Sequence, residues 1–289
     1  MSQLLAAPGV GQQLSIEMYE FGRQDLAEAL LAARGRGAEV RLIVDRTVPA
    51  SARVADWLAA RGVSVRAYPV DDRIFQIDHV KLVLVPGAAL VTGMNWGDSS
   101  AANHDYGLET RTPPVLDRLR EIFEQDWSLA GGAPAPITTR SSGPVLQTAP
   151  GDEVRKALLS AIGSAGQSIV AEIFTLTDPE VVAGFGLAHR RGVQVRLLLD
   201  PGQEVNLAAY RLLQSAGVSL AWFRLPPGAK LHAKAALFDG RELLVGSANW
   251  SQGGLSVNHE LDLLVTDHAA CSAFASRFER DWQKAVSFG

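Results

Sequence analysis

Residues 232–250 read HAKAALFDGRELLVGSANW, and residues 79–96 read HVKLVLVPGAALVTGMNW. Both stretches place a lysine two positions after a histidine, followed by a Gly-containing turn and an Asn-Trp pair. Side chains two positions apart on a strand point to the same face of the sheet. Each stretch therefore predicts a strand-turn-strand unit that presents one histidine beside one lysine.

The two stretches belong to a repeat that covers most of the chain. Glu17 and Glu172, for example, are 155 positions apart, and similar pairs recur up to the Asp-Trp that closes each copy. Internal similarity at a fixed spacing indicates a duplicated structural unit. We expect a first unit over 1–129, a linker rich in Gly, Ala, Pro, Ser and Thr over 130–143, and a second unit over 144–289.

Each unit alternates predicted strands with amphipathic helices. Strands are predicted at 14–21, 39–44, 168–176 and 194–199, and helices between them at 25–34 and 179–191. Strands separated by helices need right-handed crossovers, which produce parallel pairs. We therefore expect an α/β fold with two α/β/α halves, each containing a mixed, mainly parallel sheet. The halves should be related by a pseudo-two-fold axis, with the active site between them.

The composition is that of a globular protein, because 47% of the residues are hydrophobic and only 20% are charged. A net charge of -4 argues against a broad basic surface for nucleic acid, although it permits a local basic cleft. The single cysteine, Cys271, excludes an intramolecular disulfide. The chain contains no run of about 18 apolar residues and no secretion signal at its start, so we expect no transmembrane segment. We expect a cytoplasmic location, unless an N-terminal export signal has been removed.

The repeated side chains suit the chemistry of a phosphodiester. A histidine can attack or donate a proton, a lysine is a fixed cation, and asparagine and serine donate neutral hydrogen bonds to phosphoryl oxygens. The candidate catalytic residues are His79, Lys81, Asn95, His232, Lys234, Ser247 and Asn249. Downstream of each motif, Asp105 and Glu260 are expected to accept the second ring proton of a histidine and so fix its tautomer. A site built by both repeats makes a monomer sufficient.

At these residues the chain resembles the phospholipase D superfamily, whose signature is H-x-K-x4-D-x6-G-S-x-N. His232, Lys234, Asp239, Gly246, Ser247 and Asn249 match every position of that signature. The resemblance implies that one histidine attacks phosphorus to form a phosphohistidine, while the other protonates the leaving group. It also implies that Asp239 supports the site and that neither metal nor cofactor is needed. Family precedent favours His79 as the nucleophile, although the sequence leaves the reverse assignment open.

The first motif departs from the signature at two places. Pro86 stands at the position of the aspartate, and Thr92-Gly93 replaces the Gly-Ser pair. Pro86 has neither a carboxylate nor an N–H group, and Gly93 removes a hydroxyl donor. We expect an active but altered site, with a phosphate-binding pseudoenzyme as the alternative.

The other two repeated histidines are not predicted to be catalytic. His104 and His259 recur between an asparagine and an acid, and we expect a structural role for them. A metal site built from histidine and carboxylate ligands is disfavoured because a lysine stands at the centre of each motif.

The sequence leaves the substrate open between two classes of phosphodiester. We expect a nuclease or phosphodiesterase acting on single-stranded nucleic acid, since no membrane anchor is present. The alternative is a phospholipid hydrolase or phosphatidyl transferase of the phospholipase D or cardiolipin-synthase type. Residues 221–225 (AWFRL) suit either an interfacial element or a base-stacking surface.

Overall fold

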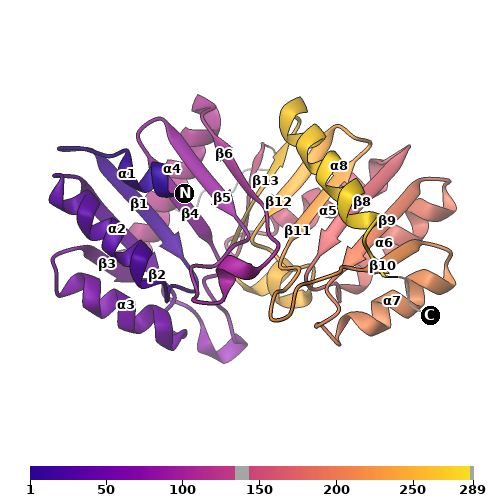
Figure 1. The fold of residues 1–289 in the computed structure, drawn as a ribbon, viewed down its shortest axis with the longest axis horizontal. Helices are drawn as coiled ribbons and strands as arrows, with labels where there is room; N and C mark the ends of the chain where they lie inside the picture. Colours follow the sequence, from indigo (N-terminus) through magenta and orange to yellow (C-terminus); the bar gives the residue numbers. More distant parts are fainter. Residues whose placement is uncertain (134–142, 287–289) are drawn as a thin grey trace.

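The computed structural model describes residues 1–133 and 143–286. Of the linker expected at 130–143, residues 134–142 lie outside the described residues. The two halves lie side by side, and the strands of one half face those of the other along the midline (Figure 1).

The first half forms one sheet, with the strand order β3-β2-β1-β4-β5-β6 among the described residues. Its strands are β1 (Gln13–Met18), β2 (Glu39–Val44), β3 (Ser64–Ala67), β4 (Lys81–Val85), β5 (Ala88–Thr92) and β6 (Gly107–Thr110). Its helices are α1 (Ser2–Ala6), α2 (Gln24–Gly35), α3 (Pro49–Ala59) and α4 (Pro113–Ala130), with short helical turns at Asp72–Ile74 and Ser100–Ala102. Proline begins α3 and α4, where its missing N–H costs nothing.

The second half repeats this plan and adds an edge strand, so that its order is β10-β9-β8-β11-β12-β13-β7. Its strands are β7 (Val145–Thr148), β8 (Ser168–Ile173), β9 (Gln194–Leu199), β10 (Ser219–Trp222), β11 (Lys234–Phe238), β12 (Glu242–Gly246) and β13 (Glu260–Val265). Its helices are α5 (Glu153–Ser164), α6 (Pro179–Arg190), α7 (Asn206–Ser215) and α8 (His268–Trp282), with a short helical turn at Gly253–Val257. The duplicated α/β fold is thus confirmed.

Both sheets are mixed, but the expectation that they are mainly parallel was wrong. In the first sheet only β1–β2 and β2–β3 are parallel, whereas β1–β4, β4–β5 and β5–β6 are antiparallel. The second sheet repeats this division and adds an antiparallel β13–β7 pair. Helical crossovers produce the parallel pairs, but the histidine-lysine strands β4 and β11 continue into short turns, which return the chain antiparallel.

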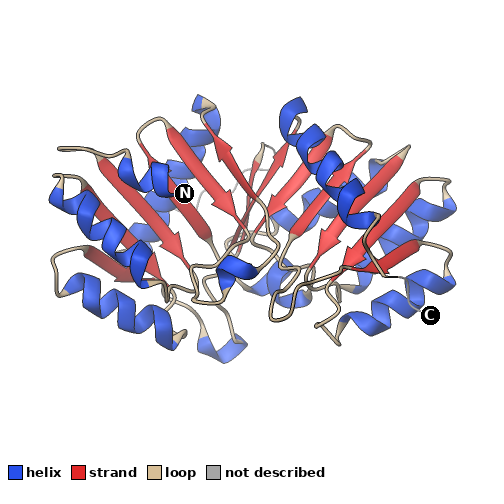
Figure 2. Cartoon of the chain, viewed as in Figure 1, coloured by secondary structure: helices blue, strands red, loops and turns tan. Residues whose placement is uncertain are grey.

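Three groups of buried apolar side chains hold the layers together. One packs α1, α2 and α3 against the first sheet, and another packs α5, α6 and α7 against the second. The third contains side chains from both sheets, among them Leu82 and Val91 from the first half and Val245 and Leu261 from the second. Figure 2 shows the strands of the two halves converging, with helices flanking them. The shared core makes the two repeats a single packed body.

Among the helices of residues 1–133 and 143–286, none is both long enough and apolar enough to cross a bilayer.

Candidate functional site

The two histidine-lysine pairs lie where β4 and β11 begin. His79 and His232 lie two residues before these strands and are 4% and 7% exposed, while Lys81 and Lys234 are buried as the first strand residues. The Nζ of Lys81 donates to the carbonyl of His79 at 2.6 Å, and Lys234 donates to the carbonyl of His232 at 2.5 Å. Because β4 and β11 meet at the shared core, the two halves bring both pairs to one place.

Each histidine is oriented by an acid from the opposite half. His79 Nδ1 lies 2.8 Å from Glu260 Oε2, and His232 Nδ1 lies 2.8 Å from Asp105 Oδ2. A carboxylate at Nδ1 holds the proton there, which leaves the lone pair on Nε2. Both imidazoles are thereby prepared to act through Nε2, and neither half can orient its own histidine.

Backbone hydrogen bonds also cross between the halves beside the two histidines. The N–H of His79 donates to the carbonyl of His259, and the N–H of His232 donates to the carbonyl of His104, both at 2.8 Å. Each crossing segment is the one that supplies the orienting acid at its next residue. The position of each acid is therefore tied to the backbone of the histidine that it contacts.

The aspartates that follow β2 and β9 anchor the start of each motif. Asp45 accepts a hydrogen bond from the N–H of Asp78 at 2.9 Å, and Asp200 accepts one from the N–H of Leu231 at 2.6 Å. The anchored residues come directly before His79 and His232. Asp45 and Asp200 therefore brace the two histidine segments.

Burial dominates the ionisation of the site. It lowers the pKa of His79 well below its usual value and that of His232 to about 3, with the lysine ammonium groups adding to the effect. Burial likewise lowers the pKa of Lys81 to about 7 and of Lys234 to about 8, and it raises the pKa of Glu260 to about 7. The field of each lysine reaches the histidine of the other half. Electrostatically, the four basic groups form one site with neutral imidazoles near pH 7.

The neutral donors have different surroundings. Ser247 Oγ donates to Glu260 Oε2 at 2.6 Å and accepts from the N–H of Leu261 at 3.0 Å, so its hydroxyl supports the orienting acid. Asn95 Nδ2 donates to Glu20 at 2.9 Å. The Oδ1 atoms of Asn95 and Asn249 are buried and have no hydrogen-bond partner among the described residues. The two amides are the members of the predicted set with hydrogen-bonding capacity to spare.

Two aromatic residues near the histidines were not predicted. The Tyr19 ring packs edge-on to His79 with centroids 4.8 Å apart, and Phe174 packs on His232 at 4.7 Å. Each ring also lies about 5 Å from the ammonium group of the lysine in its own half. Tyr19 and Phe174 are 155 positions apart, so the repeat contained the signal for them. Glu20 has Thr175 as its counterpart and left no such signal.

The glycine at position 93 makes room for the shorter acid of the first half. A Cβ atom on Gly93 would lie 2.3 Å from Asp105 Oδ1 and 3.0 Å from the carbonyl of Gly246. In the second half, the longer Glu260 leaves space for a hydroxyl at position 247. The first half thus combines a glycine with the shorter acid, Asp105, and the second half combines a serine with the longer acid, Glu260. Both combinations place a carboxylate at a histidine.

Thr92 accepts a hydrogen bond from a turn amide, and in the second half a carboxylate accepts the equivalent bonds. Asp262 Oδ1 accepts from the N–H groups of Ser247 and Ala248 at 2.9 and 3.0 Å, and Asp262 pairs across the ladder with a glycine, Gly246. In the first half, the equivalent pair has its polar residue on the first of the two strands and its glycine on the second, since Thr92 of β5 lies opposite Gly107 of β6. Thr92 Oγ1 accepts from the N–H of Met94 at 3.0 Å. The altered Thr-Gly pair thus keeps the turn hydrogen-bonded.

Asp239 does not orient the site, contrary to expectation. It lies beyond the far end of β11, five residues after Lys234, at about 16 Å for a strand rise of about 3.3 Å per residue. Its carboxylate accepts hydrogen bonds from the N–H groups of Gly166, Gln167 and Ser168. Asp239 therefore braces a distant loop, because a turn after five strand residues must lie at the opposite edge of the sheet.

Pro86 occupies the matching distant turn after β4. Asp239 and Gly240 both have positive φ values, whereas the first half uses Pro86 followed by Gly87 at φ 75°. A proline cannot adopt positive φ, so the turn has changed type to one that suits Pro-Gly. Loss of the aspartate in the first motif is therefore remote from His79.

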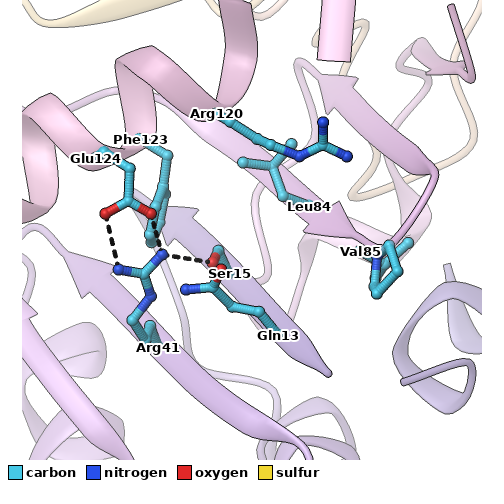
Figure 3. Close-up of a pocket in the computed structure, with 9 residues that line it drawn as sticks. Gln13, Ser15, Arg41, Leu84, Val85, Arg120, Phe123 and Glu124 are labelled. Atoms are coloured by element: carbon cyan, nitrogen blue, oxygen red, sulfur yellow. Dashed lines mark hydrogen bonds and ion pairs between the residues drawn. The ribbon is translucent and has the colours of Figure 1, made fainter. Parts of the chain in front are cut away.

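The small cavity beside Pro86 has a structural explanation. Its volume is about 170 Å³, and Arg41 lines it together with Glu124, to which Arg41 makes a two-pronged ion pair (Figure 3). The second half repeats this pair as Arg196 with Glu279. A pair kept in both halves at the far edge of the sheets serves the fold, and we assign no ligand to this cavity.

His104 and His259 enter buried acidic clusters of the opposite half, consistent with a structural role. His259 Nε2 lies 3.1 Å from Asp126 and 3.7 Å from Glu17. Burial by itself lowers the pKa of His259, but the charge and hydrogen bond of Asp126, together with the charge of Asp78, outweigh that effect and raise the pKa to about 9. His104 Nε2 lies 2.7 Å from Glu172. The ligand spacing of each cluster would also suit a metal ion, but a protonated His259 already supplies a cation to its cluster.

The aromatic residues of 221–225 are not exposed. Trp222 and Phe223 are 8% and 7% exposed, and both belong to the apolar cores. Neither ring can therefore enter an interface or stack on a base, whereas Arg224 beside them is exposed.

A duplicated α/β fold that brings a histidine and a lysine from each half into one site defines a class of phosphodiesterase-type enzymes. A family profile described as "Cardiolipin synthase, PLD-like domain" matches residues 3–127 and 158–282, which is most of both repeats. The chain belongs to this phospholipase D-like family.

Cardiolipin synthases are among the relatives of this chain. The chain is 27% identical to cardiolipin synthase A of Pseudomonas putida, over 90% of this chain and 60% of that protein. It is 29% identical to cardiolipin synthase A of Pseudomonas fluorescens, over 86% of this chain and 58% of that protein. The chain thus spans about 60% of the length of these relatives.

The fold is shared with a solved phosphatidylserine synthase of Haemophilus influenzae. The two structures superpose with a TM-score of 0.77 over 98% of this chain and 82% of the other, at 12% sequence identity. At that identity the similarity establishes the fold alone.

Proposed function

We propose that this chain transfers or hydrolyses the phosphatidyl group of a phospholipid through a phosphohistidine intermediate. The observation that carries the proposal is the pair of imidazoles whose Nδ1 atoms contact Glu260 and Asp105 across the two halves. The phospholipid substrate is supported by the cardiolipin synthases among the relatives. These relatives support the phospholipid alternative better than the nucleic acid that the sequence favoured.

The proposed reaction uses the two histidines in turn. Nε2 of one neutral imidazole attacks phosphorus and forms a P–N bond. The second imidazole takes up a proton on Nε2 as the anionic diester binds beside it, and it gives that proton to the alcohol oxygen as the P–O bond breaks. An incoming alcohol or water then gives its proton to the second imidazole and displaces the histidine, which restores the enzyme. Lys81 and Lys234 stabilise the negative oxygens of phosphorus throughout. We propose His79 as the nucleophile and His232 as the acid, since family precedent places the nucleophile in the first repeat.

The departures in the first motif do not argue for a pseudoenzyme. Gly93 accommodates Asp105, Thr92 keeps its turn hydrogen-bonded, and Pro86 lies at the opposite edge of the sheet. Each reacting group of the first half has a counterpart in the second with the same kind of partner. We therefore propose a site that turns over.

A paired substrate assay tests this proposal. Purified protein is incubated in EDTA with phosphatidylglycerol and, separately, with labelled single-stranded DNA. We expect phosphatidic acid if water is the acceptor, or a diphosphatidyl product with release of glycerol if a second lipid hydroxyl is the acceptor. Cleavage of DNA with no lipid turnover would reverse the choice of substrate. No turnover of either, even of bis(p-nitrophenyl) phosphate, would favour the pseudoenzyme.

A further inference from the structure

The turn between β3 and β4 holds two adjacent apolar side chains in solvent. Ile74 is 52% exposed and Phe75 is 88% exposed. Among the large apolar side chains exposed in the described residues, no other two are neighbours in sequence. Single exposed apolar residues are ordinary, but a clustered pair marks a surface that contacts something apolar.

The turn is rigidly hydrogen-bonded, so its apolar tip has a fixed direction. The Asp71 carboxylate accepts from the N–H of Arg73 at 3.0 Å and pairs with its guanidinium group. Gln76 Oε1 accepts from the N–H of Asp71 at 3.1 Å, and Gln76 Nε2 donates to the carbonyl of Val257 in the second half at 2.8 Å. Phe75 adopts a left-handed φ of 54°, which is costly for a bulky residue. The fold thus holds Phe75 outward rather than leaving it loose.

The tip lies close to the reacting histidine. Phe75 precedes His79 by four residues, so the chain separates them by at most about 14 Å. The connection from β10 to β11 carries the exposed cations Arg224 and Lys230, and Lys230 precedes His232 by two residues. The two connections lie at the same edge of the molecule (Figure 1). One edge therefore combines an apolar tip, exposed cations and the two motif histidines.

We propose that Ile74 and Phe75 insert into the surface of a phospholipid bilayer while Arg224 and Lys230 contact its phosphate groups. The proposal rests on the phospholipid substrate proposed above and says how that substrate is reached. Apolar and aromatic side chains that enter the acyl boundary beside basic residues are the usual means of interfacial binding. Inserted in this way, the tip brings the histidine site to the level of the lipid phosphates.

The test compares vesicle binding of the wild type with that of Ile74→Ser/Phe75→Ser, by co-sedimentation with equimolar phosphatidylcholine–phosphatidylglycerol vesicles. Loss of two apolar side chains that insert into the bilayer should weaken vesicle binding by at least about tenfold. The matched control is Leu212→Ser, which removes an apolar side chain that is 60% exposed on α7. The control should bind like the wild type, and vesicle binding by the double variant equal to the wild type would overturn the proposal.

A fluorescent label reports insertion directly. A polarity-sensitive dye on Phe75→Cys should shift its emission to the blue when vesicles are added, and the same dye on Leu212→Cys should not. The native Cys271 is buried at 2% exposure, so labelling is confined to the introduced thiol. An unchanged spectrum at position 75 would contradict insertion. A shift on adding single-stranded DNA instead would assign the tip to nucleic acid, and a shift that grows with protein concentration alone would assign it to a second copy of the chain.

A monomeric lipid separates failure of this inference from failure of the proposed function. Dihexanoyl phosphatidylglycerol below its micellar concentration offers the same diester without a surface. We expect the ratio of vesicle turnover to monomer turnover to fall by at least about tenfold in the double variant. If the wild type turns over monomer but the double variant has the same ratio as the wild type, the inference about Ile74 and Phe75 is wrong and the proposed function stands. If the wild type turns over no lipid in either form, the proposed function itself fails.

Discussion

At the scale of single residues, the main feature of this protein is an exchange of side chains between its two motifs. The second half uses Ser247, Glu260 and Asp262 around its turn, and the first half uses Gly93, Asp105 and Thr92. Each set keeps one carboxylate at Nδ1 of a histidine and one acceptor for the turn amide. A motif can therefore lose its signature letters and retain its hydrogen bonds.

Removal of either reacting imidazole should nearly abolish activity. We expect His79→Asn and His232→Asn each to lower kcat by about 100- to 10,000-fold, because each removes an acid–base or nucleophilic group. Intact-mass spectrometry after mixing with substrate should show the covalent adduct only in variants that retain the nucleophile. Near-normal kcat in either variant would contradict a site shared by the two halves.

The exchange at position 93 can be tested by a pair of variants. Gly93→Ser should push Asp105 away from His232 and lower kcat by up to about 100-fold, since small displacements of catalytic groups are costly. Gly93→Ser/Asp105→Glu rebuilds the arrangement of the second half and should recover part of that loss. If Gly93→Ser alone were as active as the wild type, the packing explanation would be wrong.

The pH dependence should differ from that of exposed histidines and lysines. Because burial lowers the pKa of His79, the proposed nucleophile stays neutral at pH 6, and kcat/KM for a soluble diester should not show the fall there that a nucleophilic histidine of ordinary pKa would produce. Because burial lowers the pKa of Lys81 to about 7 and of Lys234 to about 8, kcat/KM should decline above about pH 8 as the ammonium groups lose their protons. A quenched assay across pH 5 to 10 measures both limbs. A profile flat to pH 10 would contradict the role of the lysines.

At the scale of elements, β4 and β11 separate two groups of motif residues. Their first residues carry Lys81 and Lys234 into the site, whereas the turns after their last residues hold Pro86 and Asp239. A five-residue strand is long enough to isolate one end from the other. Asp239, the aspartate of the signature, therefore stabilises the fold in this protein and does not contact the histidine site.

Asp239→Ala should destabilise the fold and leave turnover intact. Loss of the carboxylate leaves the N–H groups of Gly166, Gln167 and Ser168 without this acceptor, which should cost about 1 to 3 kcal/mol in the free energy of unfolding. Urea denaturation measures the loss, and kcat measured well below the unfolding midpoint should match the wild type. A fall in kcat with unchanged stability would place Asp239 in the site after all.

At the scale of the whole molecule, the halves are interlocked by the segments around Asn103-His104-Asp105 and Asn258-His259-Glu260. In each segment the histidine enters an acidic cluster of the opposite half, and the next residue contacts the imidazole of the motif histidine there. Packing of the two repeats and orientation of their histidines therefore depend on the same residues.

The interlock through His259 should weaken at alkaline pH. The pKa of His259 is raised to about 9 in the folded chain from about 6.5 when unfolded, so its stabilising effect is full below about pH 6.5 and lost as pH rises through 9. The melting temperature of His259→Gln should lie below that of the wild type at pH 6.5, and the gap should close by pH 10. Comparison with the variant cancels the titration of other groups. A gap independent of pH would show that the ring acts by packing alone.

The sequence by itself determined the duplication, the α/β class and the candidate reacting residues, because each depends on patterns repeated along the chain. A histidine and a lysine two apart on a strand must share a face, and their recurrence after a constant interval requires two similar halves. The sequence also showed that the turn at Pro86 departs from the signature, but it did not show that this turn is remote from the site.

Only the tertiary structure decided which acid serves which histidine, how Gly93 and Thr92 are accommodated, and that Asp239 is remote. These facts depend on contacts between residues far apart in the chain, such as Glu260 with His79 and Asp105 with His232, which come from opposite halves. Spacing along one strand cannot report what packs on it from another. The antiparallel majority of the sheets and the exposed Phe75 were hidden for the same reason, since strand pairing and solvent exposure are properties of the assembled fold.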